Sequence, residues 1–191
     1  MNEPEVPCTK IVFFGDSITE SGRNHMDDTD LGVGYVKIAA GKLRLLYPDT
    51  KFCFLNRGVG GERTAELCAR VQKDVVDQQP DFVVLEVGIN DVWCRFSRGE
   101  EVTPDAFRAN YTYLVDTIMA TGAKLFLIQP YALKMGDKQR FRPFLAKFNE
   151  IIREIATERG LPLVPTDEIF MGVTQDIDPA QFSTDGVHPT H

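Results

Sequence analysis

A serine at the end of an apolar run is the first residue of this chain that could do chemistry. Residues 11–14 are all apolar, and Gly15, Asp16 and Ser17 follow them directly. The glycine keeps the turn tight, so a strand that ends here delivers the Ser17 hydroxyl to the edge of a sheet. A serine hydroxyl is a weak nucleophile until a base removes its proton. Ser17 therefore needs a base from elsewhere in the chain.

The chain contains three histidines, and one of them has a carboxylate at a useful spacing. His25 lies in a polar segment, and His191 is the last residue. His188 follows Asp185 by three positions in STDGVHPTH. In a turn or a first helical turn, that spacing places the carboxylate beside the imidazole, where it can hold the tautomer of the ring. Ser17, Asp185 and His188 thus form a candidate catalytic triad.

Acyl transfer by such a triad also needs hydrogen-bond donors for an oxyanion, and two segments could supply them. RGVGGERT (57–64) has glycines that leave backbone N–H groups accessible, and GIND (88–91) offers the side-chain amide of Asn90. Loss of one such donor typically slows the reaction roughly 10²–10³-fold. Other roles stay open, because the glycines could cradle a phosphate and Asn90 could cap a turn. The glycine segment lacks the lysine of a phosphate loop, however.

Two residues beside these segments, Asp16 and Trp93, have more than one interpretation. Asp16 is a candidate acid or substrate-binding residue, but its carboxylate could instead bond local backbone N–H groups and shape the turn. Trp93, the single tryptophan, could stack on a sugar ring, wall a small acyl pocket, or pack on the rim of a loop. We expect Asp91 to be structural and to hold the loop that presents Asn90.

The elements that must position these residues follow from the hydrophobic pattern. Apolar runs of strand length occur at 10–15, 51–56, 81–88, 124–130 and 161–165. Stretches of helical period lie between them, at 34–47, 62–78, 103–122 and 140–159. Continuous apolar strands that alternate with helices predict a parallel sheet covered on both faces. We therefore predict an α/β fold with three α/β/α layers, a flavodoxin-like doubly wound sheet of about five strands, in a single domain (1–191).

Most of the long connections follow strands and precede helices. They span 16–33, 89–103, 131–139 and 166 to the end, whereas the links from helix to strand are short and turn-like. In open α/β sheets, ligands bind at the carboxyl ends of the strands. The candidate residues therefore gather at the edge where a site is expected.

Composition and net charge limit the classes of binding partner and the cellular location that we expect for this protein. The 28 acidic side chains outnumber the 21 basic ones, which gives a net charge of −7 and disfavours nucleic acid as a partner. The chain begins without a secretory signal, and no apolar stretch is long enough to span a membrane. The four cysteines form no CxxC pair, so we expect buried, reduced thiols. Together these features predict a cytoplasmic protein.

Four of these segments, taken together, resemble the SGNH hydrolases, also called GDSL esterases. GDSIT (15–19), RGVGGERT (57–64), GIND (88–91) and DGVHPT (185–190) look like the four blocks of that family, in order and over nearly the whole chain. The resemblance implies that Ser17 is the nucleophile, His188 its base and Asp185 the orienting acid. It also implies an oxyanion hole made by the N–H groups of Ser17 and Gly61 and by the Asn90 amide. No cofactor is expected.

Within that family the chain looks most like intracellular acetylxylan esterases. The similar segments are GDSITESGR (15–23), GVGYV (32–36) and GINDVW (88–93). This narrower resemblance implies a small-molecule or oligosaccharide ester as substrate, with an acetyl group on a sugar. Family members usually continue for some twenty residues past the histidine block as a closing helix, whereas this sequence ends at His191. A homo-oligomer is compatible with the resemblance.

Three alternatives remain at this point. Other SGNH enzymes use the same blocks as lysophospholipases or thioesterases, so a broader lipolytic acylhydrolase is one of them. A metal-dependent hydrolase is the second, because Asp185, His188 and His191 also form a DxxHxxH pattern. The third is a catalytically silent module that binds a small ligand at the same edge.

Overall fold

A five-stranded parallel sheet forms the centre of the protein. The computed structural model describes residues 8–190. The strands are β1 (Thr9–Gly15), β2 (Phe52–Gly58), β3 (Phe82–Glu86), β4 (Lys124–Ile128) and β5 (Leu163–Val164). Their order is β2-β1-β3-β4-β5, and each neighbouring pair is parallel. The predicted α/β class and the five parallel strands are confirmed.

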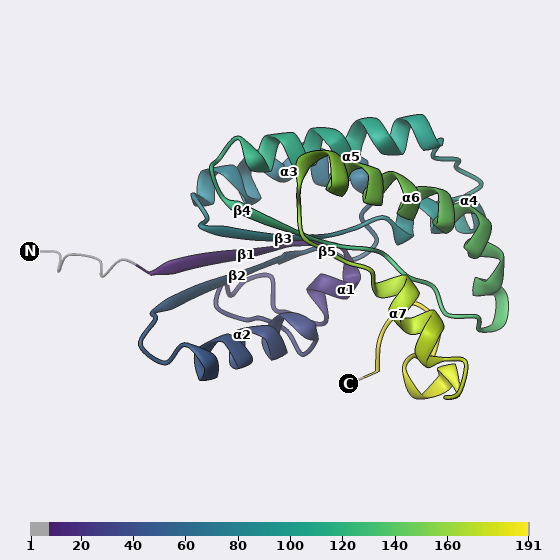
Figure 1. Cartoon of the computed structure of the whole chain (residues 1–191), viewed down its shortest axis with the longest axis horizontal. Coiled ribbons are helices and arrows are strands. Elements are labelled where there is room, and N and C mark those ends of the chain that lie inside the picture. The colour runs from purple at the N-terminus through teal and green to yellow at the C-terminus, as the bar shows by residue number, and fades with distance from the viewer. Residues whose placement is uncertain (1–7, 191) are drawn as a thin grey trace, which may run out of the picture.

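Helices cover both faces of this sheet and make the three layers (Figure 1). On one side lie α3 (Thr64–Asp74), α4 (Ile89–Ser97), α5 (Pro104–Met119) and α6 (Arg142–Arg159). On the other side lie α1 (Ser17–Glu20), α2 (Tyr35–Leu46) and α7 (Thr166–Val173). Short 3-10 turns occupy Val76–Gln78, Gly136–Phe141 and Pro179–Gln181. Strands β1 and β3 lie in the interior of the sheet, so each has a neighbouring strand on both sides and helices on both faces.

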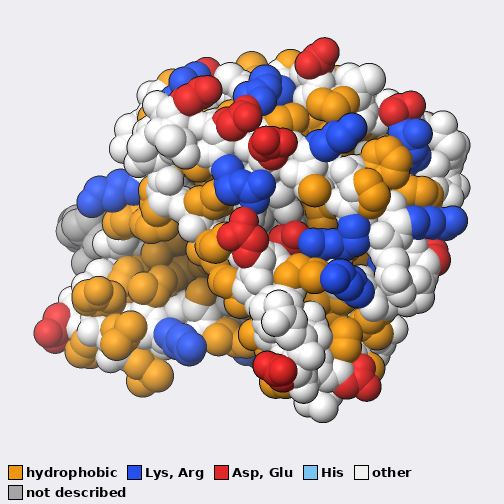
Figure 2. Space-filling view, turned by 45° about the vertical axis from the view of Figure 1, so that its right-hand side comes forward, with side chains coloured by type: hydrophobic (Ala, Val, Ile, Leu, Met, Phe, Trp, Pro, Cys, Tyr) orange, Lys and Arg blue, Asp and Glu red, His pale blue; other side chains and the backbone are white. Residues whose placement is uncertain are grey.

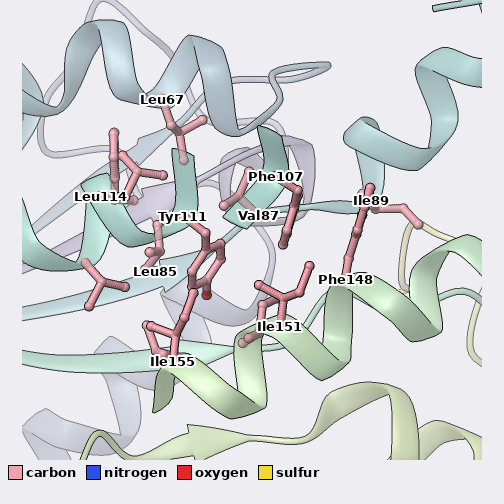
Figure 3. Close-up of a cluster of buried hydrophobic side chains, with 14 of the residues drawn as sticks. Leu67, Leu85, Val87, Ile89, Phe107, Tyr111, Leu114, Phe148, Ile151 and Ile155 are labelled. Atoms are coloured by element: carbon pink, nitrogen blue, oxygen red, sulfur yellow. The ribbon is translucent and has the colours of Figure 1, made fainter. Parts of the chain in front are cut away.

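Helix α5 shows how the sequence pattern becomes packing. The Thr103 hydroxyl accepts the N–H of Ala106 at 3.2 Å, and a proline follows Thr103 in the first turn, where its missing N–H costs nothing. The apolar side chains at helical spacing are all buried: Phe107, Tyr111, Leu114, Val115 and Ile118. Phe107 and Tyr111 point toward Ile151 and Phe148 of α6 (Figure 3), and the ring of Phe107 stacks on that of Phe148 at 4.1 Å.

Two stretches that the sequence assigns to loops contain helices instead. Helix α4 occupies the first part of 89–103, and α7 begins directly after β5. Both are short and carry acidic residues in their first turn, which suits a helix N-terminus but interrupts the apolar period in the sequence. Asn90 and Trp93 therefore stand on a helix rather than on a loop.

The cysteine prediction is wrong for two of the four residues. Cys8 and Cys53 form a disulfide, with their Cα atoms 5.8 Å apart. They are 45 residues apart in sequence, but Cys8 immediately precedes β1 and Cys53 lies on β2, which pairs with it. Pairing across two parallel strands leaves no local spacing signature, so the sequence offers no CxxC. Cys68 and Cys94 are free thiols.

The disulfide bears on the predicted location of the protein. Disulfides persist mainly in oxidising compartments, so the bond between Cys8 and Cys53 does not favour the cytoplasm. Separately, no helix within residues 8–190 is long and apolar enough to span a membrane. The cytoplasmic location therefore stays a prediction.

The disulfide should stabilise the fold by closing a loop in the unfolded chain. We expect Cys8→Ser to lower the free energy of unfolding by about 2–4 kcal/mol, measured by urea denaturation. In reductant, the variant and the unchanged protein should unfold alike. Four alkylatable thiols in the unreduced, unfolded protein would contradict the pairing.

Candidate active site

Ser17 stands where β1 ends and α1 begins. Gly15 permits the close approach of β1 to its surroundings, because a Cβ there would meet the backbone oxygen of Glu86 and the hydroxyl of Thr19 at 2.3 Å each. Asp16 caps α1 by accepting the N–H of Ile18 at 3.0 Å. Two polar residues thus follow β1 at the carboxyl edge of the sheet. Asp16 is buried, and Ser17 is half-buried.

His188 and Asp185 lie in a tight turn near the end of the described chain. Ser183 and Pro189 close this turn through an antiparallel bridge. The Oδ1 atom of Asp185 accepts the N–H of Val187 at 2.9 Å and that of His188 at 2.8 Å. The spacing of three therefore acts through a turn, in which one carboxylate oxygen shapes the backbone and the other is left for the ring.

The structure brings the three candidate triad residues together in one relay. Asp185 Oδ2 and His188 Nδ1 are 2.7 Å apart, and His188 Nε2 and the Ser17 hydroxyl oxygen are 2.8 Å apart. Since an ionised carboxylate can only accept, Nδ1 carries the proton and Nε2 accepts from the serine. This is the tautomer that a general base at Nε2 requires.

Asp185 keeps its charge in this arrangement. Partial burial raises its pKa, but the hydrogen bonds from the His188 ring and from the backbone N–H groups of His188 and Val187 outweigh burial and lower the pKa to about 2. The carboxylate is therefore ionised at any pH at which the enzyme would be assayed, and it can stabilise an imidazolium.

Three residues that could supply oxyanion donors line one cavity. The cavity has a volume of about 260 Å³, and Ser17, Gly61, Asn90 and His188 contribute to its wall. Among the described residues, no backbone acceptor takes the N–H of Ser17 or of Gly61. Gly61 has a φ of 80°, which favours glycine. The Asn90 amide donates to the Glu62 carbonyl at 2.9 Å, which fixes its orientation.

Asp91 ties the two donor segments together from below. Its buried carboxylate accepts the Thr64 hydroxyl at 2.6 Å and the Thr64 N–H at 3.0 Å. Burial raises the pKa of Asp91 to about 7, although the bonds from Thr64 oppose that rise. Because Thr64 begins α3 and Asp91 lies in the first turn of α4, the contact agrees with the structural role that the sequence suggests.

Asp16 and Trp93 fare differently as candidate substrate contacts. Asp16 is 0% exposed, so substrate contact is closed to it in this structure, and its bond to Ile18 instead matches the turn-shaping role. Trp93 lines the cavity, with its ring centre 6.0 Å from that of His188 and 5.7 Å from that of Phe141. It is a half-buried helix residue whose ring lies near both the histidine and a buried phenylalanine.

Several residues around the site escaped the sequence interpretation. The cavity wall also includes Arg63, Cys94, Ser97 and Arg98. Glu86, the last residue of β3, lies buried behind the site at 2% exposure. The available signal was its charge inside the apolar run DFVVLEVG (81–88), where a carboxylate is out of place.

The DxxHxxH interpretation receives no support from the described residues. Within residues 8–190, no group of three or more histidine, cysteine or acidic side chains is arranged to hold a metal ion. Both ring nitrogens of His188 are engaged, one with Ser17 and the other with Asp185. His191, the third member of the pattern, lies outside the described residues.

Comparison with known proteins gives consistent results. The pattern of the GDSL-like lipase/acylhydrolase family matches residues 13–191. An acetylxylan esterase of Geobacillus stearothermophilus is 31% identical over 189 residues, which cover 95% of this chain and 86% of that protein.

Solved structures agree with the sequence comparison. The acetylxylan esterase Axe2 of the same organism superposes with a TM-score of 0.87 at 30% identity, covering 95% of this chain and 87% of that one. LAE5, an α/β hydrolase from the metagenome of Lake Arreo, gives 0.88 at 29% identity, covering 95% and 88%. Three further Axe2 structures are of catalytic mutants, in which a serine, an aspartate and a histidine are each replaced by alanine.

The Asn90 amide should act mainly in the transition state. We expect Asn90→Ala to lower kcat on p-nitrophenyl acetate by roughly 10²–10³-fold with little change in KM, because an oxyanion forms only after attack. The exposed Asn24, in the loop after α1, supplies the matched control Asn24→Ala. A change confined to KM would assign Asn90 to substrate binding instead.

Proposed function

The chain belongs to the GDSL-like lipase/acylhydrolase family and is a carboxylic ester hydrolase, and on that premise we propose that it removes small acyl groups, acetyl above all, from carbohydrates. The proposal gives Ser17, His188 and Asp185 the triad roles, and it needs no cofactor. The observation that carries it is the unbroken relay from Asp185 through His188 to a serine that opens into a cavity.

The proposed roles imply the following reaction steps. His188 Nε2 takes the hydroxyl proton of Ser17 as its oxygen attacks the ester carbonyl. The oxyanion that forms is held by the N–H groups of Ser17 and Gly61 and by the Asn90 amide. His188 then gives the proton to the leaving alcohol. Water, activated by the same histidine, releases the acid from the acyl-enzyme.

The mutants of Axe2 support these roles. The aspartate and the histidine that are replaced in its catalytic mutants are three residues apart, as Asp185 and His188 are here. The replaced serine lies near the start of that chain, as Ser17 does in this one. The same three residue types occur in the same order within a shared fold. This favours the same roles here, with serine as nucleophile, histidine as base and aspartate as the orienting acid.

The shape of the site supports a small acyl group. A cavity of about 260 Å³ has to hold the acyl group and part of the alcohol, with Trp93 and His188 in its wall. Trp93 lines this cavity, so its ring can contribute apolar surface against a sugar. The relatives point the same way, since the Geobacillus protein is an acetylxylan esterase, and Axe2 is also described as an acetyl-xylooligosaccharide esterase.

A long-chain acyl substrate would need an apolar channel from Ser17, and the large apolar hollow of this protein lies elsewhere. This hollow, of about 550 Å³, lies between α2 and the sheet (Figure 2). Its wall includes Phe13, Leu43, Phe82 and Phe126. It shares no lining residue with the cavity at Ser17. An acyl chain bound at Ser17 therefore could not extend directly into this hollow.

Acyl-chain length separates the two esterase alternatives. We expect kcat/KM to be highest on p-nitrophenyl acetate, lower on the butyrate and at least about tenfold lower on the octanoate, because one methylene changes binding by ~1–3 kcal/mol in a closed pocket. Acetate release from acetylated xylo-oligosaccharides, followed by chromatography, should then identify the alcohol. Ser17→Ala is the inactive control.

A rate that held or rose toward octanoate would contradict the small-acyl proposal and favour the lipolytic alternative. Turnover by Ser17→Ala close to that of the unchanged protein would contradict the triad itself.

A further inference from the structure

Two buried carboxyl groups lie next to each other behind the nucleophile. Gly15, the last residue of β1, pairs with Glu86, the last residue of β3. Asp16 directly follows Gly15 and is therefore next to Glu86 at the same end of the sheet. Asp16 is 0% exposed and Glu86 is 2% exposed. Two ionised carboxylates in contact and without water would pay for desolvation and for mutual repulsion. One of the two must therefore hold a proton.

The hydrogen bonds around the pair indicate which carboxyl holds it. Asp16 already accepts two N–H donors, from Ile18 at 3.0 Å and from the Asn90 amide at 3.4 Å. Glu86 Oε2 accepts the Thr19 hydroxyl at 3.3 Å, whereas Glu86 Oε1 has no donor among the described residues. The charge of Asp16 acts on Glu86, but no hydrogen bond can join two ionised carboxylates, because each can only accept. Glu86 is thus the member with a free oxygen and too few donors.

We propose that Glu86 is a protonated positioning residue that donates a hydrogen bond to the Asp16 carboxylate and so fixes Asp16 beneath the Asn90 amide. This inference rests on the proposed function, because it assigns Asn90 to the oxyanion hole. The proton stays with Glu86, and Asp16 keeps its negative charge and its bond to Ile18. Its 3.4 Å contact with the Asn90 amide is long, so that N–H is shared with the oxyanion when the oxyanion forms.

The electrostatics of the pair agree with this assignment. Burial raises the pKa of Glu86 well above its ordinary value, and the charge of Asp16 raises it further. Burial raises the pKa of Asp16 to about 6, although the bonds from Ile18 and Glu86 oppose that rise. In the proposed arrangement Asp16, which has these donors, is the member of the pair that keeps its charge.

The titratable and charged groups around the pair do not supply a positive charge that could neutralise a second carboxylate. They are Tyr35 on α2, Arg70 on α3, Asp91 on α4, Tyr111 on α5, Tyr131 after β4, and His188. Burial raises the pKa of the three tyrosines, so they stay neutral. Arg70 already forms ion pairs with Glu62 and Asp74. Among these neighbours, Arg70 is therefore not a free cation that could compensate a second negative charge.

Ionisation of Glu86 should harm catalysis rather than binding. It would add a second negative charge beside Asp16 and remove the hydrogen bond that holds Asp16 in place. Both changes oppose an oxyanion that has to form close to Asn90. The proposal therefore predicts that kcat falls on the alkaline side as Glu86 loses its proton.

Two substitutions at Glu86 separate a positioning role from a merely structural one. Glu86→Gln keeps an N–H donor for Asp16 and cannot ionise, whereas Glu86→Met keeps the approximate volume and removes the donor. With p-nitrophenyl acetate, Glu86→Gln should keep kcat near that of the unchanged protein and lose the alkaline fall. Glu86→Met should lower kcat by about 10–100-fold at unchanged KM, less than or about as much as loss of a direct oxyanion donor. Glu154→Gln, at a surface ion pair with Arg108, is the control.

Two readouts decide the protonation state without using activity. Infrared spectroscopy at pH 8 should detect the carbonyl band of a buried, protonated carboxylic acid, which Glu86→Gln lacks. Because the folded-state pKa of Glu86 is raised, its stabilising contribution is complete below the ordinary pKa of 4.5 and is lost as pH rises toward the folded-state pKa. The Tm of the unchanged protein should therefore fall relative to that of Glu86→Gln above about pH 5.

The proposal fails if Glu86→Met keeps both the kcat and the pH profile of the unchanged protein, or if Glu86→Gln keeps the alkaline fall. Absence of the infrared band at pH 8 also overturns it. Failure of the proposed function gives a different result, namely an unchanged protein that hydrolyses no ester while the infrared band still reports the proton on Glu86.

Discussion

One hydrogen bond, from Ser17 to His188, makes the greatest demand on this fold because it joins positions 171 residues apart. Ser17 is placed by the end of a central strand, and His188 by a turn that Asp185 closes with its own carboxylate. If either side chain moved relative to the other by more than a fraction of an ångström, the 2.8 Å hydrogen bond would weaken or break. The parallel sheet meets this demand because the carboxyl ends of its strands converge on one edge, where rigid elements carry the reacting groups.

The same edge concentrates buried charge, which the fold tolerates only through specific partners. Asp91 is held by Thr64, and Asp16 by Ile18, Asn90 and the proposed proton on Glu86. Arg70 fastens this region from outside, because its guanidinium donates to the carbonyl of Gly15 at 3.0 Å. Such an arrangement costs stability, but it orders the site, since each carboxyl fixes a segment that carries one of the proposed oxyanion donors. The hollow between α2 and the sheet carries no such charge and has no part in this account.

The sequence predicted most where periodicity and local spacing carry the information. The buried face of α5 could be read from its helical period, and Asp185 and His188 from a spacing that a turn satisfies. Prediction failed where contacts depend on the register between strands. The pairing of Cys8 with Cys53 and the meeting of Asp16 with Glu86 both follow from which residues lie opposite each other on parallel strands, and no local pattern records that. Helix α4 was missed because polar functional residues interrupt its apolar period.

The most direct test of the account is to label the protein with a fluorophosphonate, a serine-directed reagent, and to locate the adduct by peptide mass spectrometry. The account predicts a single phosphonyl group on Ser17, loss of esterase activity in step with labelling, and labelling slowed by about a thousandfold or more in His188→Ala. An active protein whose Ser17 stays unmodified, or whose adduct lies on another residue, would contradict the assignment of Ser17 as the nucleophile.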